Sequence, residues 1–441
     1  MIERLQQRIE RGDYTVGVIG LGYVGLPLTQ AFVRQGLPIL GFDVDENRVA
    51  ALNAGRSYLK HIPSSAIERI VADGRFQATT DFARLREADA VLLCIPTPLT
   101  RHREPDMSFV EATAATVAEH LRPGHLVVLE STTYPGTTAE LVKPVLEATG
   151  LVCGKDFYLA YSPEREDPGN IDFETSTIPK VVGGHDDDSF RLARALYGRI
   201  VPQVVPVSSL ATAEAVKLTE NIFRAVNIAL VNELKVVFES MDIDVWEVIE
   251  AAKSKPFGYM PFYPGPGLGG HCIPIDPFYL TWKAREYDVA TRFIELAGEV
   301  NTGMPAYVVD RLATALDMKF STPLNGARIL VLGLAYKKNV DDIRESPALR
   351  IIATLETRGV RVDYYDPHVA EIPRTREHAT LTGRRGIVWS AEALRDYDAA
   401  LICTDHDDVD YAAVVENCRL VVDTRNATHP WREGRSNVVM A

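Results

Sequence analysis

One cysteine, Cys272, stands among residue types that suit covalent chemistry. It lies in the segment GPGLGGHCIPIDP, residues 265–277, after two glycines and four residues before the acid Asp276. Glycines leave room for a ligand to approach the sulfur, and a cysteine that captures an aldehyde lets a dehydrogenase continue to the acid. The alternative is a small buried residue, which is what most free cysteines are. We expect Cys272 to be a nucleophile and His271 to be structural.

Two further polar groups lie in apolar surroundings. Lys217, Asn221 and Arg224 occur at positions i, i+4 and i+7 of a segment with helical periodicity, so they share one face. Such a face is usually solvated, but a lysine and an asparagine that project into a closed site would donate to an oxyanion. The loop SPERED, residues 162–167, follows an apolar strand and carries Glu164 where α/β proteins collect catalytic groups.

The segment GLGYVG, residues 20–25, is typical of a dinucleotide-binding turn. It follows an apolar strand, begins a helical stretch, and is followed by Asp43 at the end of the next strand. Gly20 permits the turn, Gly22 lets the backbone approach a pyrophosphate, and Gly25 allows close helix–strand packing. Asp43 lies 43 − 25 = 18 residues beyond Gly25, which suits a ribose 2′-hydroxyl and favours NAD over NADP. The alternative is a glycine turn that binds another nucleotide or none.

Strand and helix patterns alternate over roughly the first 200 residues, which predicts a doubly wound parallel sheet. Residues 211–241 contain no glycine or proline and predict one long helix, or two joined helices, between two sheet domains. Because this helix is apolar on more than one side, we expect a dimer contact there. The strands predicted in the first part of the chain are residues 15–19, 38–43, 90–95, 125–129 and 157–160. A second α/β pattern starts at residues 325–337, without a GxGxxG turn. Its later strands are predicted at residues 361–365, 399–403 and 420–423.

The predicted fold class is α/β, with two Rossmann-like doubly wound domains joined by a central helical domain that contains the long helix. We expect an N-terminal NAD-binding Rossmann domain at residues 1–205, a central helical domain with the cysteine loop and the dimer contact at 206–318, and a C-terminal α/β domain at 319–441. The length of 441 residues accommodates about three domains of ~150 residues.

Charge and cysteine usage limit the class of partner. The chain has 47 basic and 60 acidic residues, and its net charge of −13 disfavours nucleic acid and anionic membranes. An anionic substrate would need a local basic pocket. Five scattered cysteines without CxxC spacing argue against a disulfide framework or a zinc site, and for a reducing compartment. With no signal-peptide pattern and no apolar run of ~20 residues, we expect a soluble, cytoplasmic protein without a bound metal.

Nearly the whole chain resembles the UDP-glucose/UDP-N-acetylhexosamine 6-dehydrogenases, NAD-dependent enzymes that oxidise C6 of a nucleotide sugar twice. The resemblance is specific because many motifs occur in the family's order. They are GLGYVG (20–25), CIPTP (94–98), STTYPG (131–136), SPERE (162–166), AEAVKLTEN (213–221), GPGLGGHCIPIDP (265–277) and YKKNVDDIRESP (336–347).

The resemblance implies a covalent mechanism. Cys272 would hold the aldehyde as a thiohemiacetal and, after a second hydride transfer, as a thioester. Lys217 and Asn221 would stabilise the developing oxyanion. Asp276 would be associated with water activation in thioester hydrolysis, while Thr132 and Glu164 would position the water and assist proton transfer. The implied catalytic residues are therefore Cys272, Lys217, Asn221, Asp276, Glu164 and Thr132.

The resemblance also implies binding residues, with the UDP-sugar held by the C-terminal domain and the chain forming a homodimer or a larger homo-oligomer. The expected NAD-binding residues are Gly20, Gly22, Tyr23, Val24, Gly25, Asp43, Arg48, Pro96, Thr97, Ser131, Thr132 and Arg344. The expected UDP-sugar-binding residues are Glu164, Arg165, Lys217, Asn221, Tyr263, Gly269, Tyr336, Lys337 and Arg425.

The cysteine segment also bears on which sugar is oxidised. Residues 274–276 read Pro-Ile-Asp where glucose-oxidising members commonly have Pro-Lys-Asp, which resembles the N-acetylhexosamine branch. Residues 253–267 are most similar to the UDP-N-acetylglucosamine enzymes of surface-polysaccharide synthesis, so we expect that substrate, with UDP-N-acetylmannosamine and UDP-glucose as alternatives. Lys253 and Lys255 stand near the place where some relatives carry an arginine that crosses the dimer, and we assign them no role.

The residues alone leave two other classes of function open. A two-electron hydroxyacid or sugar-acid dehydrogenase would use a Rossmann domain, a lysine and an asparagine, with Cys272 merely structural; the third α/β pattern disfavours it. A non-catalytic NAD sensor would use Cys272 as a redox switch and would not need Lys217. The number of polar residues at the expected site disfavours a sensor.

Overall fold

The chain forms two compact units. The first contains residues 1–220 and 278–290, and the second contains residues 221–277 and 291–441. His271 and the expected nucleophile Cys272 lie outside the described residues. The computed structural model describes residues 2–59, 62–100, 104–165, 177–270, 273–375 and 377–441.

A mostly parallel sheet forms the centre of the first unit. Its eight strands, counted over the described residues, follow the order β3-β2-β1-β4-β5-β6-β7-β8, and the pair β6–β7 is antiparallel. Strands β1, β2, β4, β5 and β6 are buried along their whole length, which is typical of parallel strands covered on both faces. The bounds are β1 (Val16–Ile19), β2 (Ile39–Phe42), β3 (Phe76–Thr79), β4 (Ala90–Leu93), β5 (Leu126–Leu129), β6 (Tyr158–Tyr161), β7 (Lys180–Gly184) and β8 (Val204–Pro206).

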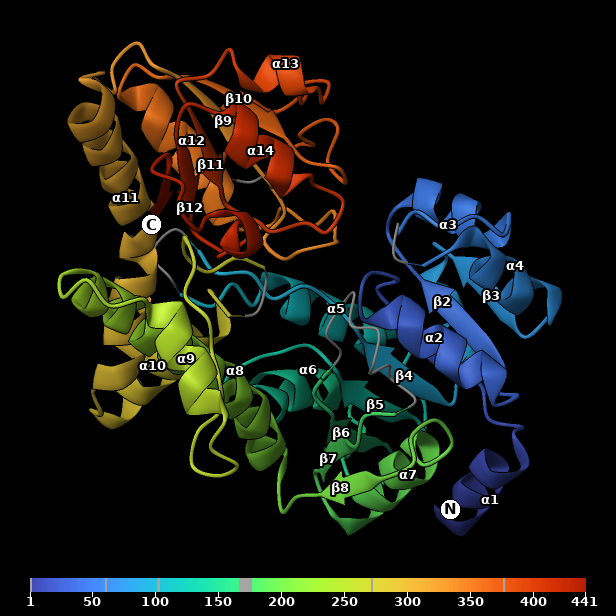
Figure 1. The fold of residues 1–441 in the computed structure, drawn as a ribbon. Coiled ribbons are helices and arrows are strands. Elements are labelled where there is room, and N and C mark those ends of the chain that lie inside the picture. Colours follow the sequence, from blue (N-terminus) through green and yellow to red (C-terminus); the bar gives the residue numbers. More distant parts are fainter. Residues whose placement is uncertain (1, 60–61, 101–103, 166–176, 271–272, 376) are drawn as a thin grey trace. The chain divides into compact units, whose positions relative to one another are not determined.

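Helices pack against this sheet at several places. Helix α2 contacts β1 and β2, and Figure 1 shows it alongside β2. Helix α7 contacts β5, β6 and β7, and α1 packs against α7. The bounds are α1 (Ile2–Arg11), α2 (Gly25–Arg34), α3 (Glu46–Asn53), α4 (Ser64–Ala72), α5 (Ser108–Glu119), α6 (Lys143–Glu147) and α7 (Asp187–Tyr197), with short helices η1 (Phe82–Glu87), η2 (Thr138–Val142) and η3 (Arg285–Tyr287).

Long helices connect the two sheets along the chain. Helix α8 (Leu210–Glu239) is one continuous helix, as the absence of glycine and proline from its sequence favours. Its residues up to Glu220 belong to the first unit and the rest to the second. Helix α9 (Val245–Lys253) begins at the N-cap Asp244, whose carboxylate accepts a hydrogen bond from the Trp246 amide at 2.9 Å. The remaining helices of this group are α10 (Asp276–Ala284) and α11 (Arg292–Phe320).

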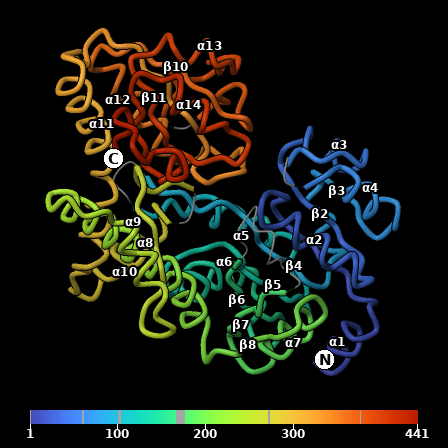
Figure 2. The backbone as a smooth tube through the Cα atoms, viewed as in Figure 1, coloured from blue at the N-terminus to red at the C-terminus, as the bar shows by residue number. Residues whose placement is uncertain are grey.

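The second unit contains a smaller sheet whose strands are all parallel. Its order is β10-β9-β11-β12-β13 in the described part of the chain. Helices α11 and α12 lie side by side (Figure 2), and Val308, Leu312 and Leu316 of α11 share one apolar core with Ile329 and Val331 of β9. The bounds are β9 (Arg328–Leu332), β10 (Arg361–Tyr365), β11 (Ala399–Ile402), β12 (Val421–Asp423), β13 (Val438–Met440), α12 (Pro347–Thr357), α13 (Ala391–Leu394), α14 (Tyr411–Asn417), η4 (Ala379–Leu381) and η5 (His429–Trp431).

The expected fold class is confirmed: a mostly parallel sheet and a parallel sheet are joined by long helices, and each strand expected from an apolar run is present. Strands β3, β7, β8 and β13 were not expected. β3 and β7 each carry a polar residue, Gln77 and Lys180, and β8 and β13 are only three residues long. The domain limits at residues 205 and 318 stay predictions. No helix among the described residues is long and apolar enough to cross a membrane.

Candidate active site

The turn after β1 fits a bound pyrophosphate. Gly20 has a φ of +90°, and a Cβ there would collide with the carbonyl of Cys94, while a Cβ on Gly25 would collide with the carbonyl of Gly20. Of the described residues, none has a heavy atom within 4 Å of a Cβ built on Gly22, so this glycine faces open space. Helix α2 begins after Val24, whose apolar side chain cannot compete with a phosphate for the first backbone amides.

Asp43 lies at this turn, as expected for a ribose-binding carboxylate. It is buried at the end of β2 and accepts hydrogen bonds from the amides of Leu21 (3.2 Å) and Asp45 (3.0 Å), and the Arg48 guanidinium lies 3.7 Å away. Tyr58 donates its hydroxyl to the Leu21 carbonyl. Burial and the Asp43 charge raise the pKa of Tyr58, so its hydroxyl stays protonated. Tyr58 was not expected, because it stands in a loop without a motif.

The loops after β4 and β5 are joined by hydrogen bonds that involve three expected cofactor residues. Ser131 Oγ accepts from the Ile95 amide at 3.0 Å and donates to the Ile95 carbonyl at 2.6 Å. Thr97 Oγ1 donates to the Thr132 carbonyl at 2.8 Å, and the Tyr279 hydroxyl donates to the Thr97 carbonyl at 2.6 Å. Ser131, Thr97 and Thr132 therefore come together at the carboxyl ends of adjacent parallel strands, where α/β proteins bind ligands.

Glu164 and Arg165 lie just beyond β6 in the same unit. The Arg165 amide donates to Glu164 Oε1 at 2.7 Å. The Arg165 guanidinium binds the Pro179 carbonyl at 2.7 Å and the Glu220 carboxylate of α8 at 2.6 Å. Arg165 thus ties this loop to α8, and its expected contact with the substrate stays a prediction.

The first turns of α8 are held by a buried carboxylate that was not expected. Glu214 is fully buried and accepts hydrogen bonds from the Gly136 amide (2.6 Å) and from the amide and hydroxyl of Thr138 (2.8 and 2.6 Å). Burial raises the pKa of Glu214 in spite of these donors. The motif STTYPG, which includes Thr132, is therefore fixed to the helix that carries buried Lys217. The sequence feature that could have indicated this contact is the acid itself, three residues before Lys217 in an apolar helix.

Asn221 and Asp276, both expected to be catalytic, meet in the second unit. Both side chains are buried, and Asn221 Nδ2 donates to Asp276 Oδ2 at 2.5 Å. The Asn221 carbonyl oxygen accepts from Arg224, so two of the three residues expected on one helix face are in contact. This pairing fixes the amide orientation of Asn221, and among the described residues its Nδ2 makes no second hydrogen bond.

The glycine loop before the cysteine packs against Tyr336, expected to bind the UDP-sugar, and Arg344, expected to bind NAD. A Cβ on Gly269 would collide with the Cβ of Tyr336, and one on Gly270 would lie 3.0 Å from the Tyr336 ring. The Gly270 amide donates to the Arg344 carbonyl at 2.9 Å. These glycines make room for Tyr336, whereas we expected them to make room for a ligand.

The remaining expected residues of the second unit have protein partners. Arg425 packs against Gly265 and donates from Nε to the Cys403 carbonyl at 3.0 Å, and burial lowers its pKa. Tyr263 stacks on Trp246 with ring centres 5.6 Å apart, and its hydroxyl donates to Glu250 at 2.7 Å. The Arg344 guanidinium forms an ion pair with Asp342. Lys337, which follows Tyr336 in the sequence, is partly buried. Arg344 belongs to the second unit, so its expected contact with the cofactor stays a prediction.

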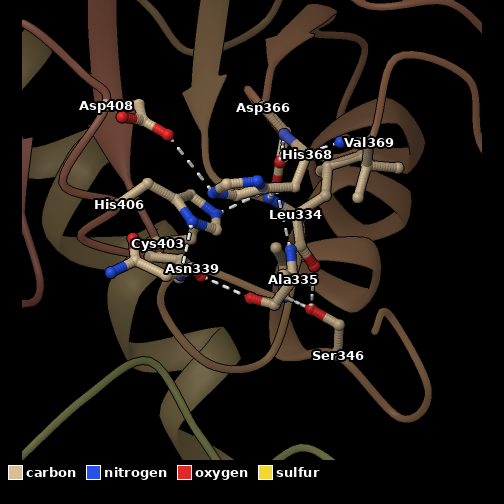
Figure 3. Close-up of polar contacts among 12 residues, drawn as sticks. Leu334, Ala335, Asn339, Ser346, Asp366, His368, Val369, Cys403, His406 and Asp408 are labelled. Carbon is tan, nitrogen blue, oxygen red and sulfur yellow. Dashed lines mark hydrogen bonds and ion pairs between the residues drawn. The ribbon is translucent and has the colours of Figure 1, made fainter. Parts of the chain in front are cut away.

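The turn after β9 repeats the arrangement at the cofactor turn with one difference (Figure 3). Asp366, at the end of β10, accepts from the amides of Leu334 (2.6 Å) and Ala335 (3.1 Å), much as Asp43 accepts from Leu21. Here His406 also donates to Asp366, from Nε2 at 3.1 Å, while its Nδ1 accepts from the Asn339 amide at 3.0 Å.

This geometry places the His406 proton on Nε2 and defines the state of the acid. Burial alone would raise the pKa of Asp366, but the hydrogen bonds from His406 and from backbone amides lower it to about 2. Asp366 and His406 together hold the segment 334–339, which carries Tyr336 and Lys337. Neither residue was expected, although an acid after the second strand of an α/β pattern was the signal used for Asp43.

The fold and these contacts define a class: a dehydrogenase with an NAD-binding parallel α/β unit and a second parallel α/β sheet. Models of the UDP-glucose/GDP-mannose dehydrogenase family match at its NAD binding domain (residues 14–201), its central domain (211–303) and its UDP binding domain (330–430). The chain belongs to this family. It is an NAD-dependent oxidoreductase, and the resemblance, enzyme class and cofactor expected from the motifs are confirmed.

Several relatives are similar over most of the chain. The UDP-N-acetyl-D-glucosamine 6-dehydrogenase of Pseudomonas aeruginosa is 37% identical over 360 residues, which cover 81% of this chain and 84% of the relative. The UDP-N-acetyl-D-mannosamine dehydrogenase of Pyrococcus horikoshii is 35% identical over 421 residues, or 93% and 95% of the two chains.

Solved structures agree with this placement. A UDP-D-ManNAc dehydrogenase from Pyrococcus horikoshii superposes with a TM-score of 0.85 at 32% identity, covering 97% of this chain and 98% of that one. An NDP-N-acetyl-D-galactosaminuronic acid dehydrogenase from Methanosarcina mazei gives a TM-score of 0.81 at 31% identity, covering 100% and 97%.

Proposed function

We propose that this enzyme oxidises C6 of UDP-N-acetylglucosamine to the uronic acid in two NAD-dependent steps. The observation that carries the proposal is the buried hydrogen bond between Asn221 and Asp276, because Asp276 lies four residues from Cys272 and Asn221 is an oxyanion donor in this mechanism. The overall reaction consumes one alcohol, two NAD⁺ and one water, and yields one carboxylate, two NADH and three protons. NAD supplies a hydride acceptor at each oxidation.

The chain's own residues perform the remaining steps of the proposed reaction. The Cys272 sulfur adds to the C6 aldehyde and forms a thiohemiacetal; loss of a hydride to NAD⁺ and of the hydroxyl proton converts this to a thioester. Lys217 and the second amide N–H of Asn221 donate to the oxyanion. Water then attacks the thioester with help from Asp276, Glu164 and Thr132, which releases the acid and restores the thiol.

The choice of an N-acetylated sugar rests on the segment after Cys272. Ile275 is only 7% exposed, so the position that commonly holds lysine in glucose-oxidising members is an apolar, packed one here. The glucosamine configuration follows the similarity to the Pseudomonas aeruginosa enzyme. UDP-N-acetylmannosamine is the second candidate, because the Pyrococcus horikoshii enzyme matches a longer part of the chain.

A substrate panel tests this proposal. UDP-N-acetylglucosamine, UDP-N-acetylmannosamine, UDP-N-acetylgalactosamine and UDP-glucose are each given with NAD, and kcat/KM and NADH yield are measured. We expect UDP-N-acetylglucosamine to exceed the others by at least about tenfold in kcat/KM. A preference for UDP-glucose would contradict the branch assignment, and no oxidation of any of the four would contradict the proposed function.

Replacement of the nucleophile tests the covalent mechanism. Cys272→Ser should abolish formation of the acid while leaving the melting temperature and NAD binding unchanged, because serine is nearly isosteric but does not form a thioester. Acid formation is measured by chromatography of the nucleotide sugars. A serine variant with full activity would refute covalent catalysis.

We further propose that the enzyme is a homodimer that uses α8. Phe223, Leu230 and Val237 are spaced by seven residues, so they lie on one face of the helix, and their exposures are 47%, 51% and 43%. Three large apolar side chains exposed in one row favour a protein contact over a solvated surface.

A further inference from the structure

A buried group of ionisable side chains that the proposed mechanism does not use lies against Glu164 in the first unit. Lys180 begins β7, and its Nζ lies 2.7 Å from Oε2 of Glu130, the residue that follows β5. The Lys180 and Glu130 side chains are only 4% and 0% exposed. Tyr197 of α7 donates its hydroxyl to the other oxygen of Glu130. Glu130, Lys180 and Tyr197 are called the Lys180 cluster below.

The ammonium of Lys180 also contacts the expected catalytic residue. Its Nζ lies 3.4 Å from Glu164 Oε2 and 3.4 Å from the Pro163 carbonyl oxygen. An ammonium has three N–H bonds, and Glu130, Glu164 and Pro163 accept all three. Lys180 therefore links the loop after β5 to the loop after β6 through charge-assisted hydrogen bonds.

Burial and the neighbouring charges determine which side chains of this group are ionised. Burial opposes the charge of Lys180, but Glu130 and Glu164 raise the pKa of the lysine above its ordinary value, so the ammonium stays charged at neutral pH. Burial raises the pKa of Glu130 even though Lys180 opposes this. Tyr197 stays neutral because burial and Glu130 raise its pKa.

In the described part of the chain, Cys94 and Arg165 are two further titratable residues near Glu164. Cys94, after β4, stays a thiol because burial raises its pKa. Arg165 donates its backbone amide to Glu164, but its guanidinium is bound to Glu220 and Pro179. Lys180 forms an ion pair with Glu164.

A buried ion pair is a costly way to hold a fold together. Desolvation of the two charges offsets much of their attraction, and well-packed apolar side chains of similar size often stabilise as well or better. The cost is easier to understand if the pair orients a functional group. Glu164 is such a group in the proposed function, and its side chain, beyond β6, is 13% exposed whereas those of Lys180 and Glu130 are 4% and 0% exposed.

We propose that Lys180 is a positioning residue that holds Glu164 as an oriented carboxylate, and that Glu130 and Tyr197 hold Lys180 in place. This inference rests on the proposed function, since Glu164 acts in its proton-transfer steps. An ionised Glu164 can accept a proton from water or from the substrate hydroxyl, whereas a protonated Glu164 cannot. The Lys180 cluster therefore sets the lower pH limit of the reaction.

The test compares pH profiles of single variants. The acid limb of kcat/KM reports a group of the free enzyme that must be unprotonated. Lys180→Met should move this limb to higher pH and lower kcat on the order of 10²-fold, with KM for the UDP-sugar changed much less. Glu130→Gln keeps the ammonium and removes a competing carboxylate, so its acid limb should stay in place or move to lower pH.

A second lysine of the same unit provides a matched control. Lys283 is also buried, with Nζ 2.8 Å from Glu140 and 2.7 Å from Glu286; these two carboxylates are exposed, and neither acid is an expected site residue. Lys283→Met should lower the melting temperature while its pH profile matches the wild type. A shift of the acid limb to higher pH in Lys180→Met but not in Glu130→Gln cannot result from loss of stability alone.

The double variant Lys180→Met/Glu130→Gln covers the case in which Lys180→Met does not fold. It leaves neither Glu130 nor Lys180 as an unpaired buried charge, and it should still show the raised acid limb. A wild-type pH profile and kcat in either variant would overturn the inference. If the wild-type enzyme oxidises none of the four UDP-sugars, the proposed function fails instead, and the two failures are therefore distinguishable.

Discussion

At the scale of single residues, each unit has an aspartate in the equivalent position, and this aspartate fixes a glycine turn. Asp43 and Asp366 each follow the strand that lies next to the turn, and each accepts the amide of the residue after a glycine with positive φ. In the first unit the acid lies next to an open turn that fits a dinucleotide. In the second, His406 binds the same oxygen, Oδ2, that accepts the turn amides, and Oδ1 accepts the amides of His368 and Val369, so the acid holds a loop and is not available to a ribose.

Asp366 should make stability depend on pH in the acid range. Its pKa of about 2 in the folded protein lies below the ordinary value of 3.8, so the ionised form stabilises the fold by about 2 kcal/mol. This stabilisation is complete above about pH 5 and is lost as the pH falls towards 2. The unfolding free energy of Asp366→Asn should therefore be lower than that of the wild type at pH 7, and the difference should shrink on acidification. Equal stabilities at pH 7 would contradict this assignment.

Sequence could predict some of these residues and not others. Asp43 was predictable because the dinucleotide turn fixes its distance along the chain. The pair Lys180–Glu130 was not, because its members are 50 residues apart and only the sheet order brings β7 near the end of β5. A lysine at the start of a buried strand also contradicts the usual exposure of that residue type.

At the scale of elements, the turn between β1 and α2 depends on glycines for two different reasons. Gly25 must lack a Cβ because α2 packs against the turn itself, whereas Gly22 must lack one only if a ligand approaches. The same distinction separates the structural from the cofactor-binding role of this segment, so a pair of alanine variants can measure each role alone.

Gly22→Ala should keep the melting temperature of the wild type and weaken NAD binding at least about tenfold, because the added methyl group occupies space used by the pyrophosphate. Gly25→Ala should lower the melting temperature, since its Cβ would overlap the Gly20 carbonyl. Isothermal titration with NAD and thermal unfolding give the two quantities. Unchanged NAD affinity in Gly22→Ala would show that the pyrophosphate does not lie over this glycine.

The elements themselves were largely predictable where one signal was strong. The 30-residue helix α8 was predictable from an uninterrupted helical period, and the apolar parallel strands from their composition. How α8 is held was not, because the Glu214 carboxylate binds amides 76 and 78 residues earlier in the chain. Such a long-range contact leaves no periodic signal in the sequence.

At the scale of the whole molecule, the net charge of the protein and the charge of a UDP-sugar have the same sign. The net charge of −13 would repel a UDP-sugar, so we expect binding to depend on local cations, for which Arg425 and Lys337 are the predicted positions. We therefore expect these two positions to matter more for KM than surface lysines do.

The proposed dimer makes a prediction for the assembled protein. Leu230→Asp introduces a charge in the middle of the exposed row on α8 and should convert the homodimer to monomers, because an unpaired charge in an apolar interface is not tolerated. Light scattering after gel filtration measures the mass of each form. A wild-type protein that is monomeric at micromolar concentration would contradict the proposed use of α8.

The central claim is that one enzyme carries an alcohol to an acid through a thioester. The most direct measurement is the molar yield of NADH from a limiting amount of UDP-N-acetylglucosamine, with the product identified by mass spectrometry. We predict two NADH for each UDP-sugar and a uronic acid as the product. One NADH for each UDP-sugar, with an aldehyde or a ketone accumulating, would contradict the account.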